Sequence, residues 1–188
     1  METDTIAPPE EKHLWTYEEL EKLPETLQPT EIWNGELIVS PAPTPNHQRI
    51  VANLTMSLMK FVEDRSLGKV YVSPLDVVFS SHRVMQPDVF VVLNANAGIV
   101  QDRVRGVPDL TVEVISEGSW RRDRIDKKEL YAQFGVKEYW IVDPEARTIE
   151  IFVLTNEGYK LHSKAGEANP INSSLLPGLS LSFREIEL

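Results

Sequence analysis

The sequence predicts an α/β (α+β) fold in which a central mixed β-sheet is flanked by helices. Three observations predict it. Apolar segments of strand length recur along the 188 residues; the segment 46–64 carries the apolar face of one long helix; and residues 110–143 have the pattern strand, loop, amphipathic helix, strand. No internal repeat or low-complexity tract interrupts this order. We expect a flexible tail over residues 1–13 and a single domain over residues 14–188.

The first elements follow from short local signals. Thr16 and Glu19 form the T-x-x-E capping-box pattern, which predicts a short helix over residues 17–23 that ends at Pro24. Asn34-Gly35 lies between alternating apolar and polar residues, and this pattern predicts a β-hairpin. Three prolines at positions 41, 43 and 45 then end the second strand.

The middle of the chain predicts one helix and two strands. Apolar residues recur at helical spacing from Asn46 to about Asp64, so this helix belongs to the core; its face consists of Ile50, Leu54, Leu58 and Phe61. Residues 70–80 and 84–92 read as two antiparallel strands joined near 80–83. Residues 94–108 are expected to be irregular.

The last third contains the segment 110–143 and the elements after it. A strand is expected over 148–154, with a turn at residues 156–158 and a return strand to His162. Pro177-Gly178 predicts another turn, followed by a last strand or a docked segment.

Composition limits the class of protein. The chain has no cysteine, which excludes a disulfide framework, a thiolate metal site and a thiol nucleophile. The N-terminal residues lack the pattern of a signal peptide, and no stretch approaches the roughly 20 apolar residues of a membrane span. We expect a cytoplasmic protein with no membrane partner.

Charge is unevenly distributed. The formal net charge of −10 disfavours nonspecific binding to nucleic acid, but residues 1–36 alone hold ten acids and two bases, a local charge of −8. The remainder therefore carries only −2. Five bases crowd one short segment of it: Arg121, Arg122, Arg124, Lys127 and Lys128. Such a run can contact phosphate or can simply solvate the start of a helix, and both interpretations remain open.

Glu113 is the anomaly of the segment 110–143, because it interrupts an apolar strand. A buried carboxylate is costly unless a cation or a hydrogen-bond donor meets it. Lys127 lies at helical spacing with Leu130, Tyr131 and Phe134, which places its ammonium inside an apolar stripe. Asp88 stands at the start of another apolar run. We expect these two acids and this lysine to converge.

Two interpretations of this cluster remain open. Asp88 and Glu113 could bind Mg²⁺ or Mn²⁺, with Lys127 stabilising charge in a transition state or orienting a water. Alternatively, Lys127 only neutralises Glu113 under a loop.

Other residues are weaker candidates. Asp123 could hold Lys127 through an i,i+4 pair, and Glu31 or Glu36 could supply a third acid. His47, at the start of the long helix, could reach a phosphate or a water but could equally be a surface or packing residue. Trp120, in the loop before the last helix, could stack on a base or fill a hole. The remaining histidines lack metal-ligand spacing: His13, His82 and His162. Phosphate-binding glycine motifs and the G-x-S-x-G elbow are absent.

Several motifs taken together resemble one protein family. They are PDVFVV at 87–92, VEVIS at 112–116, the D-x-x-x-K-x-x-x-Y spacing of Asp123, Lys127 and Tyr131, and GVKEYWIVDP at 135–144. With EIWNGELIVSPAPTPNHQRI and LLPGLSL, they resemble the Uma-two family of restriction-endonuclease-like proteins in the PD-(D/E)XK nuclease superfamily. The resemblance covers roughly residues 15–183.

The resemblance implies a restriction-endonuclease-like core, a metal-dependent DNA endonuclease activity and the catalytic set Asp88, Glu113 and Lys127. Asp88 and Glu113 match the superfamily's metal-binding acids. The superfamily lysine would fall at Ile115, so this chain departs from the pattern, and Lys127 on the following helix takes its place. A second departure, residues 117–120, affects the shape of the loop.

Two further expectations concern partners. Small nucleases that cut two strands often do so as two copies, and the apolar faces of the terminal strands need a cover, so we expect a homodimer. The alternative function is a catalytically inactive domain that acts as a structural or partner-binding module, a role compatible with the acidic charge.

Overall fold

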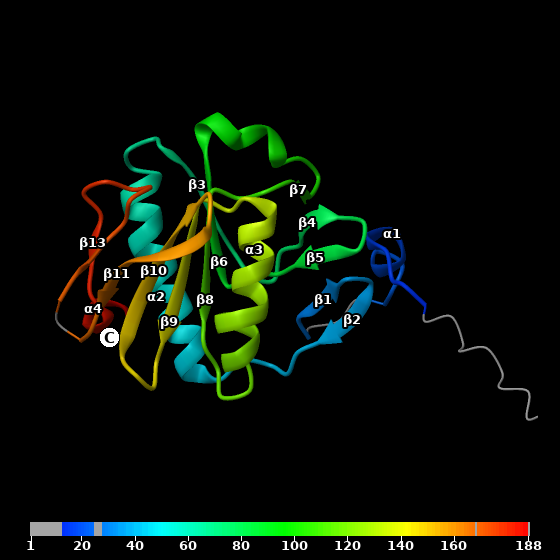
Figure 1. Cartoon of the computed structure of the whole chain (residues 1–188), viewed down its shortest axis with the longest axis horizontal. Coiled ribbons are helices and arrows are strands. Elements are labelled where there is room, and N and C mark those ends of the chain that lie inside the picture. Colours follow the sequence, from blue (N-terminus) through cyan, green and yellow to red (C-terminus); the bar gives the residue numbers. More distant parts are fainter. Residues whose placement is uncertain (1–12, 25–27, 168, 188) are drawn as a thin grey trace, which may run out of the picture.

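The structure, a computed structural model, describes residues 13–24, 28–167 and 169–187 (Figure 1). Most of the expected N-terminal tail therefore lies outside the described residues. The chain forms an α/β fold with mixed sheets and flanking helices, as predicted. Instead of one sheet, however, the described residues build two large sheets and a small two-stranded one.

The central sheet has six strands in the order β11-β10-β9-β8-β6-β3. Their bounds are β3 Gly68–Val72, β6 Val89–Leu93, β8 Leu110–Val114, β9 Glu138–Asp143, β10 Thr148–Thr155 and β11 Gly158–Ala165. Within it β8 and β9 pair in parallel, whereas the other neighbours are antiparallel, so the sheet is mixed. The predicted strand and turn after residue 148 are confirmed, and both strands of that hairpin are longer than expected.

Helices cover both faces of this sheet. Helices α2 (Pro45–Val62) and α4 (Phe183–Glu187) pack on one face, and α3 (Lys128–Phe134) packs on the other (Figure 1). The predicted apolar face of α2 is buried against β3, β6 and β8. Alternate residues of β8 point to opposite faces: Val112 and Val114 face α2, so Glu113 faces the α3 side. The sequence-predicted core helix is thus confirmed.

The second sheet has the strand order β2-β1-β5-β4-β7. Its strands are β1 Thr30–Trp33, β2 Glu36–Val39, β4 Val77–Ser80, β5 Arg83–Met85 and β7 Val104–Arg105. The predicted hairpin at Asn34-Gly35 is β1-β2, with both turn residues at positive φ.

The two long strands expected in the middle of the chain, over residues 70–80 and 84–92, are not formed. Each divides into a strand of the central sheet and a strand of the second sheet, so that β3 pairs with β6 and β4 with β5. The divisions fall at Ser73-Pro74 and at Gln86-Pro87, where proline has no N–H to donate to a ladder. Asp88 therefore stands at the corner where the chain passes between the two sheets.

The helix before β9 differs from the expected regular α-helix. It begins at Trp120, so this residue lies on the helix and not in the preceding loop. Its second turn, η2 (Arg122–Lys127), is a π-helix that runs directly into α3, and Gly135 ends the helix in the left-handed conformation. Wide π turns are rare and recur at functional sites.

The remaining elements of the described chain are short helices and strands. Helix α1 (Tyr17–Leu20) has the predicted capping box, with both reciprocal hydrogen bonds of Thr16 and Glu19. The segment expected to be irregular contains the 3-10 helix η1 (Asn94–Ile99). After the turn at Gly178, the chain forms β13 (Ser180–Leu181), which pairs with β12 (Ile171–Asn172), and then α4. No helix of the described residues is long and apolar enough to cross a membrane.

Candidate active site

Glu113 lies at the centre of a buried charged cluster on the α3 side of the central sheet. Its side chain is 3% exposed. One carboxylate oxygen, Oε1, accepts a hydrogen bond of 2.7 Å from the Tyr131 hydroxyl, and Oε2 lies 2.7 Å from Lys127 Nζ. Burial raises the pKa of Glu113 well above its usual value, although the positive charge of Lys127 opposes this shift.

Asp88 faces Glu113 across two adjacent strands. The pairing of Val89 with Val112 places Asp88, one residue before β6, opposite Glu113. Its Oδ2 accepts a hydrogen bond of 2.8 Å from the backbone N–H of Val114. The same oxygen lies 3.2 Å from Nε2 of His47. Both contacts involve Oδ2, so they fix the orientation of the carboxylate.

Lys127 reaches the cluster from the π turn η2. Its ammonium is 3.4 Å from Glu31 Oε1 and 3.9 Å from Asp123 Oδ1, in addition to the contact with Glu113. Burial alone would lower the pKa of Lys127, but the surrounding carboxylates, Glu113 first, outweigh burial and raise it. Lys127 is therefore positively charged at neutral pH.

Two residues that the sequence offered only as weak candidates belong to the cluster. Glu31 reaches it from β1, where its Oε1 also accepts the backbone N–H of Gln86 at 2.9 Å. His47 reaches it from the first turn of α2. Burial disfavours the imidazolium, but the hydrogen bond and charge of Asp88 prevail and raise the pKa of His47. Neither residue is close to Asp88 or Glu113 in sequence, so only the tertiary fold could place them.

Asp123 is held inside the cluster rather than at the surface. Its side chain is 4% exposed and accepts a hydrogen bond from the Ser119 hydroxyl. Burial raises the pKa of Asp123, against the charge of Lys127. The i,i+4 relation to Lys127 predicted from sequence is present, although the 3.9 Å distance makes it the longest of the three ion pairs of Lys127.

The cluster opens into a cavity of about 310 Å³. Its walls include all six residues of the cluster: Glu31, His47, Asp88, Glu113, Asp123 and Lys127. Three of these carboxylates pair with the ammonium of Lys127, and the fourth, Asp88, lines the same cavity. Either protonation or a bound cation must relieve this excess of negative charge. Tyr131 does not line the cavity, but its hydrogen bond to Glu113 was not predicted; the D-x-x-x-K-x-x-x-Y spacing was the signal for it.

The remaining candidates lie elsewhere. Glu36 is exposed and lines a different cavity. Trp120 is 52% exposed, so it fills no hole, and its ring lies 5.7 Å from the guanidinium of Arg124. His82 contacts the backbone oxygen of Trp15, and His13 pairs with Glu19.

The basic run is partly neutralised within the described chain. Arg124 forms ion pairs with Asp143 and Glu150, and the ammonium of Lys128 lies 3.7 Å from the centre of the Phe152 ring. Arg122 donates to the Ser40 hydroxyl at 3.1 Å and lines the cavity. Of the five bases, Arg124 and Lys127 pair with acids within the described residues, which leaves Arg121, Arg122 and Lys128 to attract an external phosphate.

The donor set of the cavity suits a hard cation such as Mg²⁺ only with help from other ligands. Among the described residues, no three histidine, aspartate or glutamate side chains are grouped closely enough to hold a metal ion by themselves. Mg²⁺ usually binds through one or two carboxylates and keeps several waters or substrate oxygens. Asp88 and Glu113 are the two carboxylates that the sequence predicts for this role.

Comparisons with known proteins agree with this architecture. A crystal structure of "a putative nuclease belonging to DUF820" from Anabaena variabilis ATCC 29413 is similar with a TM-score of 0.77 and 19% identity, covering 92% of this chain and 97% of that one. At that identity the likeness shows the fold alone. The type IIG restriction endonuclease BpuSI has a TM-score of 0.41 at 14% identity, covering 79% of this chain and 16% of that one, which is too low to support an argument.

The structural similarity shows only the fold, whereas a family model shows the family. No curated protein matches the chain. The model of the family Uma2, described as "Putative restriction endonuclease", matches residues 17–184. That match spans far more than half of the sequence and includes every residue of the charged cluster, and the chain therefore belongs to the Uma2 family.

Proposed function

We propose that the chain is a divalent-cation-dependent endonuclease that hydrolyses phosphodiester bonds in DNA. The observation that carries this proposal is the excess of buried negative charge around Lys127, in a cavity that opens to solvent. Ion clusters that serve only stability need no such excess, because unbalanced buried charge is costly. Membership of the Uma2 family supports the class of reaction.

Asp88 and Glu113 are the residues that would hold the cation. They lie opposite each other on neighbouring strands, so their carboxylates can share one ion. Oδ2 of Asp88 is occupied by Val114 and His47, which makes Oδ1 the oxygen available to the ion. When bound, a divalent cation activates a water and neutralises charge on a phosphoryl oxygen.

Lys127 would act on the substrate, and His47 would act on Asp88, one of the two ligands of the cation. The charged Lys127 can stabilise the extra negative charge that develops on the phosphoryl group. Glu31 and Asp123 position that ammonium through their ion pairs. His47 orients Asp88 through Oδ2, a positioning role that requires only its hydrogen bond.

A structural or partner-binding module is the rival function, and one observation favours it. Both oxygens of Glu113 already have protein partners, Lys127 and Tyr131, as expected of a satisfied internal cluster. A purely structural Glu113 should contribute mainly to stability, whereas a ligand should contribute mainly to activity.

The test compares the parent with Glu113→Gln on plasmid, linear and single-stranded DNA in Mg²⁺ or Mn²⁺, with thermal melting followed in parallel. Glu150→Gln is the matched control, because Glu150 is buried in the same sheet and pairs with Arg124 and Lys164 outside the cavity. We expect cleavage by the parent and the control, and a loss of at least about 100-fold in Glu113→Gln with the fold retained.

Two results would contradict the nuclease assignment: a parent that cuts no DNA with either metal, or a Glu113→Gln variant that cuts as well as the parent. A large fall in melting temperature confined to Glu113→Gln, without cleavage by the parent, is the outcome that the structural module predicts.

A further inference from the structure

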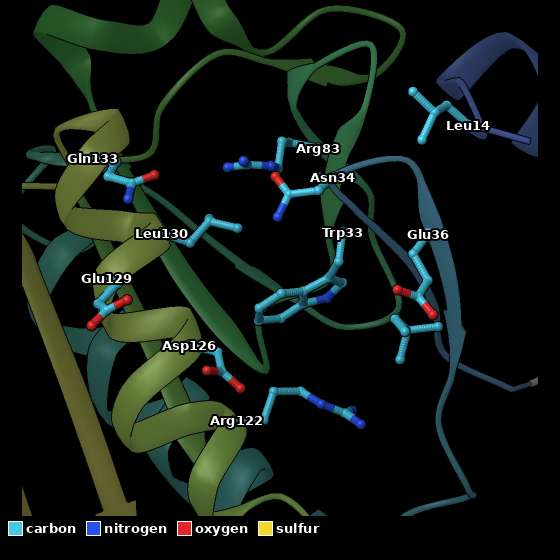
Figure 2. A pocket seen from close by; sticks show the side chains of 11 residues that line it. Leu14, Trp33, Asn34, Glu36, Arg83, Arg122, Asp126, Glu129, Leu130 and Gln133 are labelled. Atoms are coloured by element: carbon cyan, nitrogen blue, oxygen red, sulfur yellow. The ribbon is translucent and has the colours of Figure 1, made fainter. Parts of the chain in front are cut away.

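A second cavity, of about 570 Å³, lies beside the proposed active site. It separates the β1-β2 hairpin from the helix formed by η2 and α3 (Figure 2). Arg122 lines both cavities, so the two share a wall. Whatever binds in the second cavity is therefore placed next to the phosphodiester that the acids would cut.

Trp33 presents its indole to this cavity. Figure 2 shows the ring projecting from the hairpin toward the helix, with Arg83 on one side of it and Arg122 on the other. The indole Nε1 donates a hydrogen bond of 3.1 Å to Oε2 of Glu31. Because Oε1 of the same carboxylate pairs with Lys127, the ring is oriented by a member of the charged cluster.

The rest of the lining offers donors and acceptors around that ring. Asp126, Glu129 and Gln133 project from successive turns of the helix (Figure 2). The structure gives these three side chains no hydrogen-bond or ion-pair partner within the described part of the chain. Carboxylates and amides of this kind recognise the edges of nucleobases, and a carboxylate suits an exocyclic amino group.

The charge of the lining argues for a base and against a run of phosphates. Three acids, Glu36, Asp126 and Glu129, outnumber the two arginines. A surface of this sign does not attract the backbone of a duplex. An aromatic face binds any base by stacking, which depends little on net charge. The volume also falls within the range of small-ligand sites.

We propose that this cavity binds one unpaired nucleobase of the DNA strand, adjacent to the bond that is cut. Its placement beside a scissile bond rests on the proposed function; the binding itself does not. The base stacks on Trp33, and Arg122 stands between the base and the catalytic acids, where the intervening phosphate lies. Since a base must leave the double helix to enter, the substrate class is single-stranded or locally unpaired DNA.

The test measures binding without cleavage, by fluorescence anisotropy in EDTA. Three labelled DNAs of equal length are compared: a mixed-sequence single strand, its duplex, and a single strand of abasic sites that keeps the phosphates. The variants are Trp33→Leu, which removes the ring; Trp33→Phe, which keeps an aromatic face; and Trp15→Leu, a matched change at a tryptophan that packs outside the cavity.

The parent should bind the single strand more tightly than the duplex or the abasic strand. Trp33→Leu should weaken binding of the single strand about tenfold and leave the abasic strand unaffected, whereas Trp33→Phe and Trp15→Leu should bind like the parent. Melting curves identify any variant that fails to fold. If Trp33→Leu does not fold, the binding of intact and abasic strands by the parent and by Trp33→Phe still tests the inference.

Equal affinity of the parent for intact and abasic strands, tighter binding of the duplex, or a Trp33→Leu variant that binds like the parent would overturn the inference. These outcomes leave the cleavage assay untouched. Conversely, Trp33-dependent binding by a protein that cuts nothing would refute the nuclease and retain the base site.

Discussion

At the scale of single residues, the positive charge of Lys127 lowers the free-energy cost of burying the carboxylates of the charged cluster. Its ammonium pairs with the carboxylates of Glu31, Glu113 and Asp123, and the residue is 6% exposed. Removing one partner of a buried ion pair is strongly destabilising, because the remaining charge stays buried without compensation. The lysine therefore has a measurable structural role whatever chemistry the site performs.

We expect Lys127→Met to lower the free energy of unfolding by about 3–5 kcal/mol, as measured by urea denaturation. Lys137→Met is the matched control: Lys137 also pairs with a buried acid, Asp109 at 2.6 Å, but its side chain is 62% exposed. An ion pair made by a solvated ammonium contributes about 1 kcal/mol or less to the free energy of unfolding. Similar losses in the two variants would show that the cluster does not depend on Lys127.

Asp76 gives a prediction about pH. Burial raises its pKa, although the hydrogen bond from Gln86 opposes the shift. A carboxyl whose pKa is higher in the folded state than in the unfolded state destabilises the fold once pH exceeds the unfolded value, and this penalty vanishes at lower pH. Asp76→Asn should therefore melt a few degrees above the parent at pH 7.

Melting at pH 3 provides the check on Asp76, because the carboxyl is then protonated in both states and the advantage of Asp76→Asn should disappear. An advantage that is constant with pH, or a variant less stable than the parent at pH 7, would refute the role of burial at this residue.

The sequence predicted Asp88, Glu113 and Lys127 as a group because a lone acid in an apolar strand and a lysine in an apolar stripe are visible locally. Their convergence is a property of the structure, whereas their catalytic roles stay predictions. Glu31 and His47 could not be ranked from sequence. Each approaches from a different element, and no local pattern reports a contact with Asp88 or Lys127 across so many residues.

At the scale of elements, the start of α2 positions His47. Thr44 caps this helix by accepting a hydrogen bond of 3.3 Å from the backbone N–H of His47, and Pro45 occupies the first turn. Losing such a cap typically costs about 1 kcal/mol. The cap therefore supports both the stability of the helix and the approach of His47 to Asp88.

Thr44→Ala should lower the free energy of unfolding by about 1 kcal/mol. Thr55→Ala, in the middle of the same helix, should be neutral or slightly stabilising, because alanine is the better helix former there. Chemical denaturation of both variants distinguishes the positions, and an equal effect would mean that Thr44 does not act as a cap.

Helices were predicted more accurately than sheets for a physical reason. The apolar face of α2 and the capping box of α1 are local, so both were predicted to within a few residues. The division of residues 70–80 and 84–92 between two sheets was missed, because apolar residues typical of strands stand on both sides of Ser73-Pro74 and of Gln86-Pro87. The two prolines were the local signal that each strand ends there. The π turn was also missed, since one widened turn hardly changes the spacing of apolar residues.

At the scale of the whole molecule, the reason for expecting a homodimer has changed. The apolar residues near the C-terminus, such as Leu181, Phe183 and Ile186, are buried against α2 within the chain. They need no second copy as a cover. The homodimer stays a prediction that rests only on the need to cut two strands, and sedimentation at micromolar concentration tests it: a 21.4 kDa species would refute it.

The proposed activity depends most on a divalent cation, held by Asp88 and Glu113, that neutralises the excess negative charge of the cavity. Titration calorimetry with Mn²⁺ measures this directly, without DNA. The comparison needs the parent, Asp88→Ala and the control Asp102→Ala, which removes an acid outside the cavity whose side chain is 71% exposed.

We predict that the parent and Asp102→Ala bind Mn²⁺ with the same affinity, and that Asp88→Ala binds at least about tenfold more weakly, as expected when one of two carboxylate ligands is lost. Equal Mn²⁺ affinity in the parent and in Asp88→Ala would contradict the metal assignment, and with it the proposed mechanism.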